Sequence, residues 1–132
     1  MSGKVKAYAH FDITLKNVRW SWAGCADSGR VAVGIWEDEY YNDQNPQYSC
    51  IGHPRLHLWR GRHGNRERID ILKKVWAKQD RSFHVVMMTA KDNSKEPRQT
   101  KKAEPMPFKM RLISLDQNTG EFSAERVEGD YA

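Results

Sequence analysis

The middle of the chain carries a dense run of arginine and histidine side chains around one tryptophan, Trp59. Guanidinium groups match phosphate oxygens in paired hydrogen bonds, and each phosphate that a cation neutralises releases counterions. A solvated, charged surface without a ligand is the alternative interpretation. We expect the run, with a later lysine-rich segment, to bind nucleic-acid phosphates. The candidate phosphate-binding residues are Arg55, Arg60, Arg62, Arg66, Arg68, Lys95, Arg98, Lys101 and Lys102.

A second group combines tryptophans with an acidic triplet and a tyrosine. If Trp36 and a neighbouring tryptophan faced a common cavity, they could stack on both faces of an extruded base, with Asp38 accepting its exocyclic amine. The alternative is core packing, because tryptophans at alternate strand positions usually bury against their own sheet. The candidate base-pocket residues are Trp20, Trp22, Trp36, Asp38 and Tyr40.

A third group has the spacing of a weak metal motif, C-x2-H-x3-H, formed by Cys50, His53 and His57. These side chains could hold zinc with Cys25 as a fourth ligand. A structural zinc site usually shows paired ligand knuckles, however, and this segment has only one. We therefore expect no metal and no other cofactor.

Motifs for catalysis are absent from the sequence: it has no glycine-rich phosphate loop, no H-E-x-x-H and no G-x-S-x-G. A binding module is therefore expected rather than an enzyme. Two alternatives remain open, a small metal-dependent nuclease or hydrolase and a phage-type inhibitor that binds another protein.

The length and composition favour one folded domain over residues 1–132. A chain of this length has room for one core, and 39% hydrophobic residues are enough to form it. No apolar stretch approaches the roughly 20 residues of a membrane span, and the N-terminus has no apolar signal region. We expect a cytoplasmic protein that does not contact membranes, in which both cysteines stay reduced.

The positive charge is concentrated in two central blocks. Residues 55–81 hold nine basic and three acidic side chains, and residues 91–111 hold seven and three. Residues 1–54 and 112–132 are each acidic in balance. A polyanion would therefore meet the middle of the chain.

Several patterns predict the elements that position these residues. A strand is expected over 9–15, a β-hairpin over 17–36 and an irregular loop over 40–54. An amphipathic helix with Asn65 as its N-cap should carry Ile69, Leu72, Val75 and Trp76 on one face, followed by a buried strand over 83–90. Residues 91–107 predict a mobile basic loop, and residues 108–115 and 121–127 predict a second hairpin.

These elements predict an α+β fold with a small, curved, mostly antiparallel barrel-like sheet and one main helix. Three segments resemble small bacterial and phage-type modules of the PUA/SRA-like group, which includes EVE and ASCH domains. They are V-R-W-S-W-A-G at 18–24, V-A-V-G-I-W-E-D-E at 31–39, and R-E-R-I-D-I-L followed by F-H-V-V-M-M-T-A-K-D within 66–92.

The resemblance implies a concave pocket that accepts a flipped, often modified, base in DNA, or that binds RNA. It also implies a place in a restriction or phage-host defence system, with a partner protein supplying any nuclease. Carried over by position, Trp22 and Trp36 would be pocket walls, Asp38 the base-edge acceptor, and Arg98 a phosphate or base contact.

Overall fold

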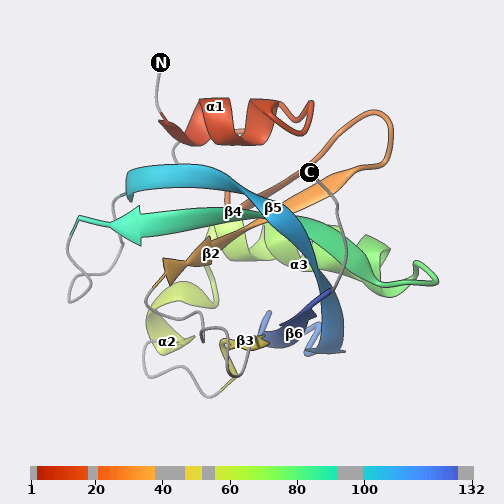
Figure 1. Cartoon of the computed structure of the whole chain (residues 1–132). Coiled ribbons are helices and arrows are strands. Elements are labelled where there is room, and N and C mark those ends of the chain that lie inside the picture. Colours follow the sequence, from red (N-terminus) through yellow and green to blue (C-terminus); the bar gives the residue numbers. More distant parts are fainter. Residues whose placement is uncertain (1–2, 18–20, 38–46, 52–55, 92–99, 128–132) are drawn as a thin grey trace.

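The computed structural model describes residues 3–17, 21–37, 47–51, 56–91 and 100–127 (Figure 1). Its helices are α1 (Gly3–Ala9), α2 (Leu56–Trp59) and α3 (His63–Trp76). Its strands are β1 (Ala23–Cys25), β2 (Val31–Trp36), β3 (Gln47–Ser49), β4 (Ser82–Ala90), β5 (Thr100–Leu115) and β6 (Phe122–Arg126). None of the helices in this part of the chain has the length and apolar character needed to cross a bilayer.

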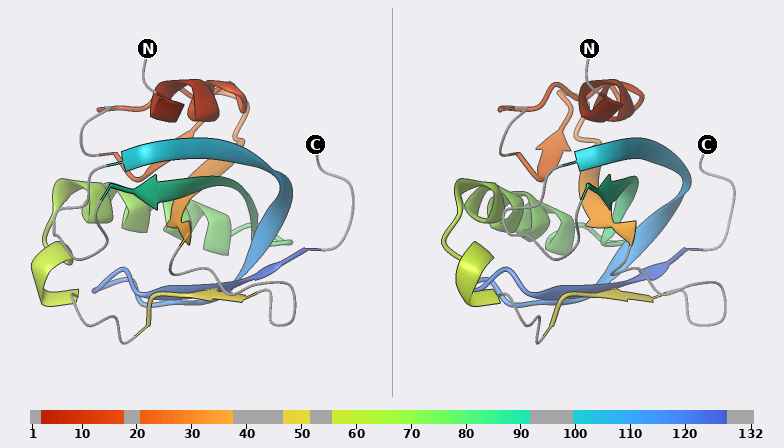
Figure 2. Two further views of the ribbon diagram at one scale, coloured as in Figure 1. Left: turned by 60° about the vertical axis from the view of Figure 1, so that its left-hand side comes forward. Right: turned by 90° about the vertical axis from the view of Figure 1, so that its left-hand side faces the viewer.

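The strands form one mixed sheet in the order β1-β2-β4-β5-β6-β3. Strands β2 and β4 pair in parallel, and every other neighbouring pair is antiparallel. The α+β class is therefore confirmed, with α3 as the main helix. As the described strands pair, the sheet is open, with β1 and β3 at its edges, and β5 bends along its length (Figure 2).

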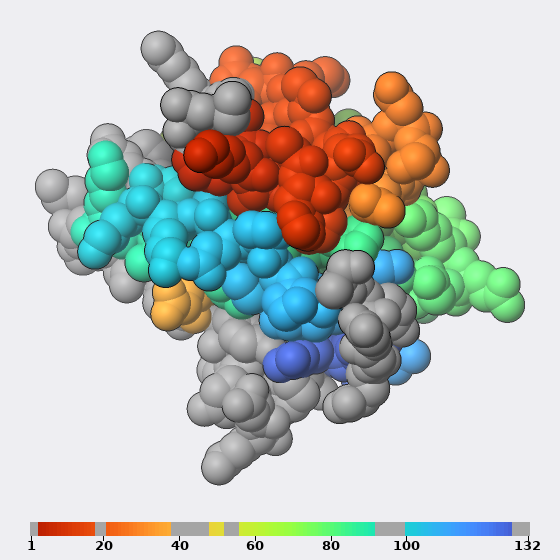
Figure 3. Space-filling view, turned by 45° about the horizontal axis from the view of Figure 1, so that its top comes forward, coloured from red at the N-terminus to blue at the C-terminus, as the bar shows by residue number. Residues whose placement is uncertain are grey.

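Both faces of the sheet are covered. Helix α3 packs Leu72 and Val75 against Val33, Phe83 and other residues of one face. Helix α1 and the residues after it pack Tyr8 and Phe11 against the other face. Figure 3 shows α1 lying across β5 on this second side.

The central strands are apolar on both sides because both sides are covered. In β2, Val33 and Ile35 join the core under α3, whereas Ala32 joins the core under α1. Strand β4 confirms the predicted buried strand over 83–90 and occupies an interior position of the sheet.

The predicted helix is confirmed, but its N-cap was wrong. Helix α3 begins at His63, and Arg62 at the cap position makes no side-chain capping bond. Asn65 lies within the helix, fully buried, where its amide donates to the carbonyls of Arg60 (2.8 Å) and Thr119 (2.9 Å). The Asn65 amide therefore binds a residue distant in sequence, Thr119, and does not cap the helix as the local pattern predicted.

The two predicted hairpins are present. Strands β1 and β2 pair from Ala23 with Val33, so β1 begins later than expected; residues 18–20 lie outside the described residues. Strands β5 and β6 form the second hairpin, and Gly120 in its turn has a φ of +85°. This left-handed backbone is the conformation that glycine adopts without strain.

The strand predicted over 9–15 was wrong. Residues 3–9 form α1, and Asp12 has a φ of +62°, which interrupts an extended backbone. The alternating Phe11, Ile13 and Leu15 are all buried, as in a strand, but they insert into the core without a ladder of strand hydrogen bonds. The burial of every second residue therefore did not by itself mean that this segment pairs with another strand.

The mobile basic loop predicted over 91–107 was wrong for its second half. Residues 100–107 belong to β5, where Ala103 pairs with Met88 of β4. Two prolines fit there because register shifts interrupt the β4–β5 ladder. Residues 92–99 lie outside the described residues, as does much of the loop predicted over 40–54, within which residues 47–49 form β3.

Gly120 offers a test of how the second hairpin locks onto α3. A Cβ at this position would overlap the Asn65 amide, and the positive φ adds backbone strain. We expect Gly120→Ala to lower the free energy of unfolding by about 2–3 kcal/mol, measured by urea denaturation. Gly29 is the matched control, because its φ is +93° and a Cβ there meets open space. Gly29→Ala should cost only about 1 kcal/mol; equal losses would show that Asn65 yields to the new methyl group.

Candidate functional site

Arg68, predicted to bind phosphate at the surface, is buried in an aromatic box. Only 6% of the residue is exposed, and its guanidinium lies 4.9 Å from the ring centroid of Trp22, 5.4 Å from Trp59 and 5.2 Å from Phe122. Its Nη2 donates to Asn65 Oδ1 at 3.0 Å, whereas its Nε has no hydrogen-bond partner. The arginine therefore joins the helix, the first hairpin and the second hairpin from inside.

The other predicted cations that can be placed lie near the start of α3 and the start of β5. Arg60 and Arg66 are exposed, and the Arg62 Nε donates to the Leu58 carbonyl at 3.2 Å. Lys101 and Lys102 are exposed on β5. Arg55, Lys95 and Arg98 lie outside the described residues.

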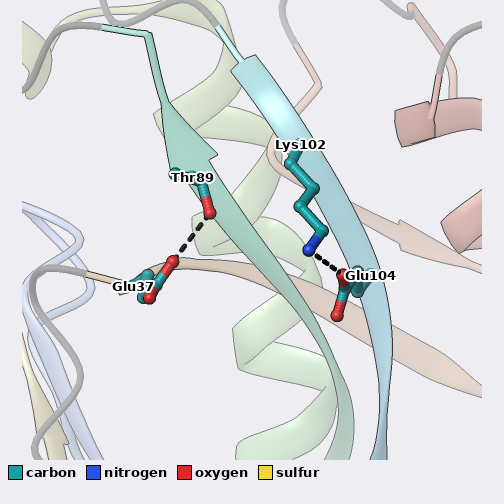
Figure 4. Close-up of polar contacts among 4 residues, drawn as sticks. All are labelled: Glu37, Thr89, Lys102 and Glu104. Carbon is teal, nitrogen blue, oxygen red and sulfur yellow. Dashed lines mark hydrogen bonds and ion pairs between the residues drawn. The ribbon is translucent and has the colours of Figure 1, made fainter.

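The start of β5 carries carboxylates as well as lysines (Figure 4). Lys102 pairs with Glu104 at 2.6 Å, and this bond raises the lysine pKa. Nearby, Thr89 Oγ1 donates to Glu37 Oε2 at 2.7 Å. The charge in this group is mixed, so it is a weaker attractor of phosphate than its lysines alone suggest.

The structure does not bring Trp22 and Trp36 together. Trp22 packs against the core under α3, whereas Trp36 packs against the core under α1. The two indoles therefore lie on opposite faces of the sheet and cannot be the two walls of one pocket. Trp20, Asp38 and Tyr40 lie outside the described residues.

The weak metal candidates are separated by their surroundings. The Cys50 thiol is buried beside β6, within 3.9 Å of the Gly120 carbonyl and 3.7 Å of the Phe122 carbonyl. His57 is exposed on α2, and His53 lies outside the described residues. Within the described ranges, no three histidine, cysteine or acidic side chains gather closely enough to hold a metal ion.

A pocket of about 630 Å³ lies between the β1–β2 turn, the segment after α3 and the middle of β5. We call it the cationic pocket, because arginine and lysine side chains dominate its polar wall. Its lining residues are Ser28, Gly29, Arg30, Val31, Lys78, Ser82, Phe83, His84 and Lys109. Figure 3 shows the β1–β2 turn beside the segment after α3 at one end of the molecule.

Strand register brings these distant residues together. His84 pairs with Ala32 of β2 on one side and with Lys109 of β5 on the other. Arg30 immediately precedes β2, and Lys78 follows α3, where its Nζ donates to the Gly29 carbonyl at 3.4 Å. Cations from three parts of the chain thereby meet around one histidine.

The His84 side chain is buried at the wall of the cationic pocket with an unsatisfied nitrogen. The residue is 9% exposed, and its ring stacks on Phe11 at 4.5 Å between centroids. Its Nδ1 has no hydrogen-bond partner. Burial, and then Lys109, Arg30, Lys78 and His10, lower the His84 pKa to about 4. The ring is therefore neutral near pH 7.

Two carboxylates stand near the cationic pocket without lining it. Asp12 lies 3.5 Å from Arg30, but its side chain is 84% exposed. Asp80 accepts the Ser82 hydroxyl at 2.8 Å, and this bond lowers the pKa of the Asp80 carboxyl. Among the residues that the structure describes, no acidic side chain lines the cationic pocket.

Local sequence patterns could not reveal this site. Lys78 and Lys109 belong to the two basic blocks, but the block containing Arg30 is acidic in balance. Only the pairing of β2, β4 and β5 places the three cations together. A comparison with protein-family models, curated proteins and solved structures finds no match to the chain.

Substitutions at Arg68 and Arg66 compare a buried arginine that supports the fold with an arginine at the surface. We expect Arg68→Ala to lower the free energy of unfolding by about 2–4 kcal/mol, because it empties space among three aromatic rings and leaves the Asn65 oxygen without its donor. Arg66→Ala removes the same charge from the exposed face of α3 and should change stability by less than about 0.5 kcal/mol. Urea denaturation measures both. Similar losses for the two variants would contradict this assignment.

The depressed pKa of His84 predicts a loss of stability in acid. Below about pH 6.5 the unfolded chain binds a proton that the folded chain refuses until about pH 4, so the free energy of unfolding falls across this range. We expect this group to account for about 1–2 kcal/mol, allowing for solvent at the pocket mouth. His84→Phe keeps a ring to stack on Phe11 and should lose less stability than the original protein between about pH 7 and pH 4.5. Parallel pH profiles for both proteins would refute the assignment.

Proposed function

We propose that this protein binds nucleic acid through its phosphate backbone, with the cationic pocket as the seat of one phosphate group. The observation that carries the proposal is the meeting of Arg30, Lys78 and Lys109 around a buried histidine, in a pocket that no acidic side chain of the described residues lines. A phosphate suits this pocket, because its charge matches the cations and its oxygens can accept from them and from the hydroxyl groups of the pocket wall.

The chemistry of the cationic pocket favours an anion over a metal or an apolar ligand. Its polar side chains are cationic, hydroxyl or imidazole groups, which donate hydrogen bonds to an anion. Nucleic acid is favoured among anions because further basic side chains, including Arg60 and Arg66, are exposed elsewhere on the surface. Such side chains can contact successive phosphates of a longer backbone.

The resemblance to PUA/SRA-like modules supports the same class of ligand. The α+β fold with its bent β5 is compatible with the curved sheet of that group (Figure 2). Reading a flipped or modified base in DNA, as part of a restriction or defence system, is the finer form of this proposal. That form cannot rely on Trp22 and Trp36 as facing walls, since they lie on opposite faces of the sheet.

Two lysines on β5 give a matched test. We expect Lys109→Ala to weaken binding of a fluorescein-labelled oligonucleotide by about three- to tenfold and to reduce the salt slope of log K by about 1, since one phosphate contact is lost. Lys101→Ala removes the same charge outside the cationic pocket and should have a smaller effect. Fluorescence anisotropy at about 50 and 200 mM salt measures both.

Asp12 supplies a variant that should gain affinity. Asp12→Asn removes the carboxylate that competes for Arg30, and asparagine tolerates the left-handed backbone at this position. We expect binding about two- to threefold tighter in the same titration. The proposed function is wrong if the original protein binds no oligonucleotide, or if binding does not depend on salt. The phosphate seat is wrong if Lys101→Ala weakens binding as much as Lys109→Ala.

A further inference from the structure

A second pocket, of about 570 Å³, adjoins the cationic pocket. It lies between the end of α3 with the segment after it, strand β5 and the residue that follows β6, and we call it the indole pocket after Trp76. Its lining residues are Trp76, Ala77, Lys78, Gln79, Asp80, Arg81, Ser82, Arg111, Leu112 and Val127. Lys78 and Ser82 line both pockets, so a ligand of modest size can reach from one into the other.

Arg81 is held in place within the indole pocket. Its guanidinium carbon lies 3.9 Å from the centroid of the Trp76 ring. Its backbone has a φ of +52°, which is unusual for a residue with a side chain, and its carbonyl accepts the Leu112 amide at 2.9 Å. Strained backbone positions of this kind persist where the surrounding structure fixes them, and they cluster at binding sites.

The stacked guanidinium offers a planar face beside polar groups. The Arg81 guanidinium lies over the Trp76 ring, and Arg81 is exposed to solvent. Guanidinium groups stack readily on aromatic faces, so a second flat ring could stack on the side away from Trp76. Gln79 and Asp80 line the same pocket and could contact the edge of such a ring. Arg111 also lines this pocket and is paired with Glu125.

We propose that the indole pocket takes the base of an unpaired nucleotide, stacked on the Arg81 guanidinium, while a phosphate of the same strand occupies the cationic pocket. This inference rests on the proposed function. A nucleotide joins a planar base to a phosphate through one sugar, which matches two adjoining pockets of planar and cationic character. Bases of a duplex are stacked inside the helix, so a single strand or an extruded nucleotide is the ligand that fits.

The test compares an oligomer of deoxythymidine with an abasic oligomer of the same length and backbone charge. Both carry fluorescein, and binding to the full chain is measured by anisotropy. We expect the base-bearing strand to bind the original protein about tenfold more tightly, which is the range that stacking of one base provides.

Arg81→Lys is the discriminating variant. It keeps the positive charge but loses the planar group, so it should bring the base-bearing strand down to the affinity of the abasic strand and leave the abasic strand unchanged. Arg126→Lys is its matched control, because it makes the same change at an arginine that lies over another aromatic ring, 4.2 Å from the centroid of Phe108, and that lines neither pocket. That variant should keep the preference for the base-bearing strand. Circular dichroism confirms that both variants fold.

The outcomes separate the two proposals. Equal binding of base-bearing and abasic strands by the original protein, lowered in both by Lys109→Ala, would overturn the indole pocket and leave the phosphate seat intact. Failure of every oligonucleotide to bind would overturn the proposed function itself. If Arg126→Lys abolished the preference and Arg81→Lys did not, the base would lie elsewhere and the inference would fall.

Discussion

The parallel pairing of β2 with β4 is the constraint on which the rest of the structure depends. It joins two strands that are far apart in sequence and places them inside a sheet covered on both faces. Their side chains alternate between the core under α3 and the core under α1, so both strands are largely apolar, with His84 as a buried polar exception in β4. The same register pairs His84 with Ala32, which lies two positions after Arg30 in the sequence. The pairing of β2 with β4 therefore contributes to both the core and the cationic pocket.

Arg68 and Asn65 form the second connection within the fold. Both are buried on α3, and through them the helix contacts the indole of Trp22, the indole of Trp59 and the turn of the second hairpin. A buried guanidinium is costly unless its charge is compensated, and three aromatic faces and one amide oxygen provide that compensation here. This use of an arginine explains why a block of basic residues overstates the charge presented to a ligand.

The distribution of charge at the surface follows the same rule. At the start of β5, lysine stands among carboxylates, and the charges largely satisfy one another (Figure 4). Around the cationic pocket, Arg30, Lys78 and Lys109 surround a histidine that burial keeps neutral. Asp12 and Asp80 offset part of this positive charge from outside the pocket, and a bound anion would offset more of it. The electrostatics therefore favour anion binding at the end of the molecule that carries the cationic pocket. The basic runs of the sequence did not indicate this end.

Local patterns were sufficient to predict the hairpins, helix α3 and the buried strand β4, because turn residues and hydrophobic periodicity act over a few positions. Contacts distant in sequence account for the features that local patterns missed: the parallel pair, the helix at Gly3–Ala9 where a strand was expected, the burial of Arg68, and the separation of Trp22 from Trp36. The cationic pocket belongs to this second class, because its cations come from separate segments and meet only through strand register. The physical reason is that a charge pattern records which side chains exist, whereas packing decides which of them share a face.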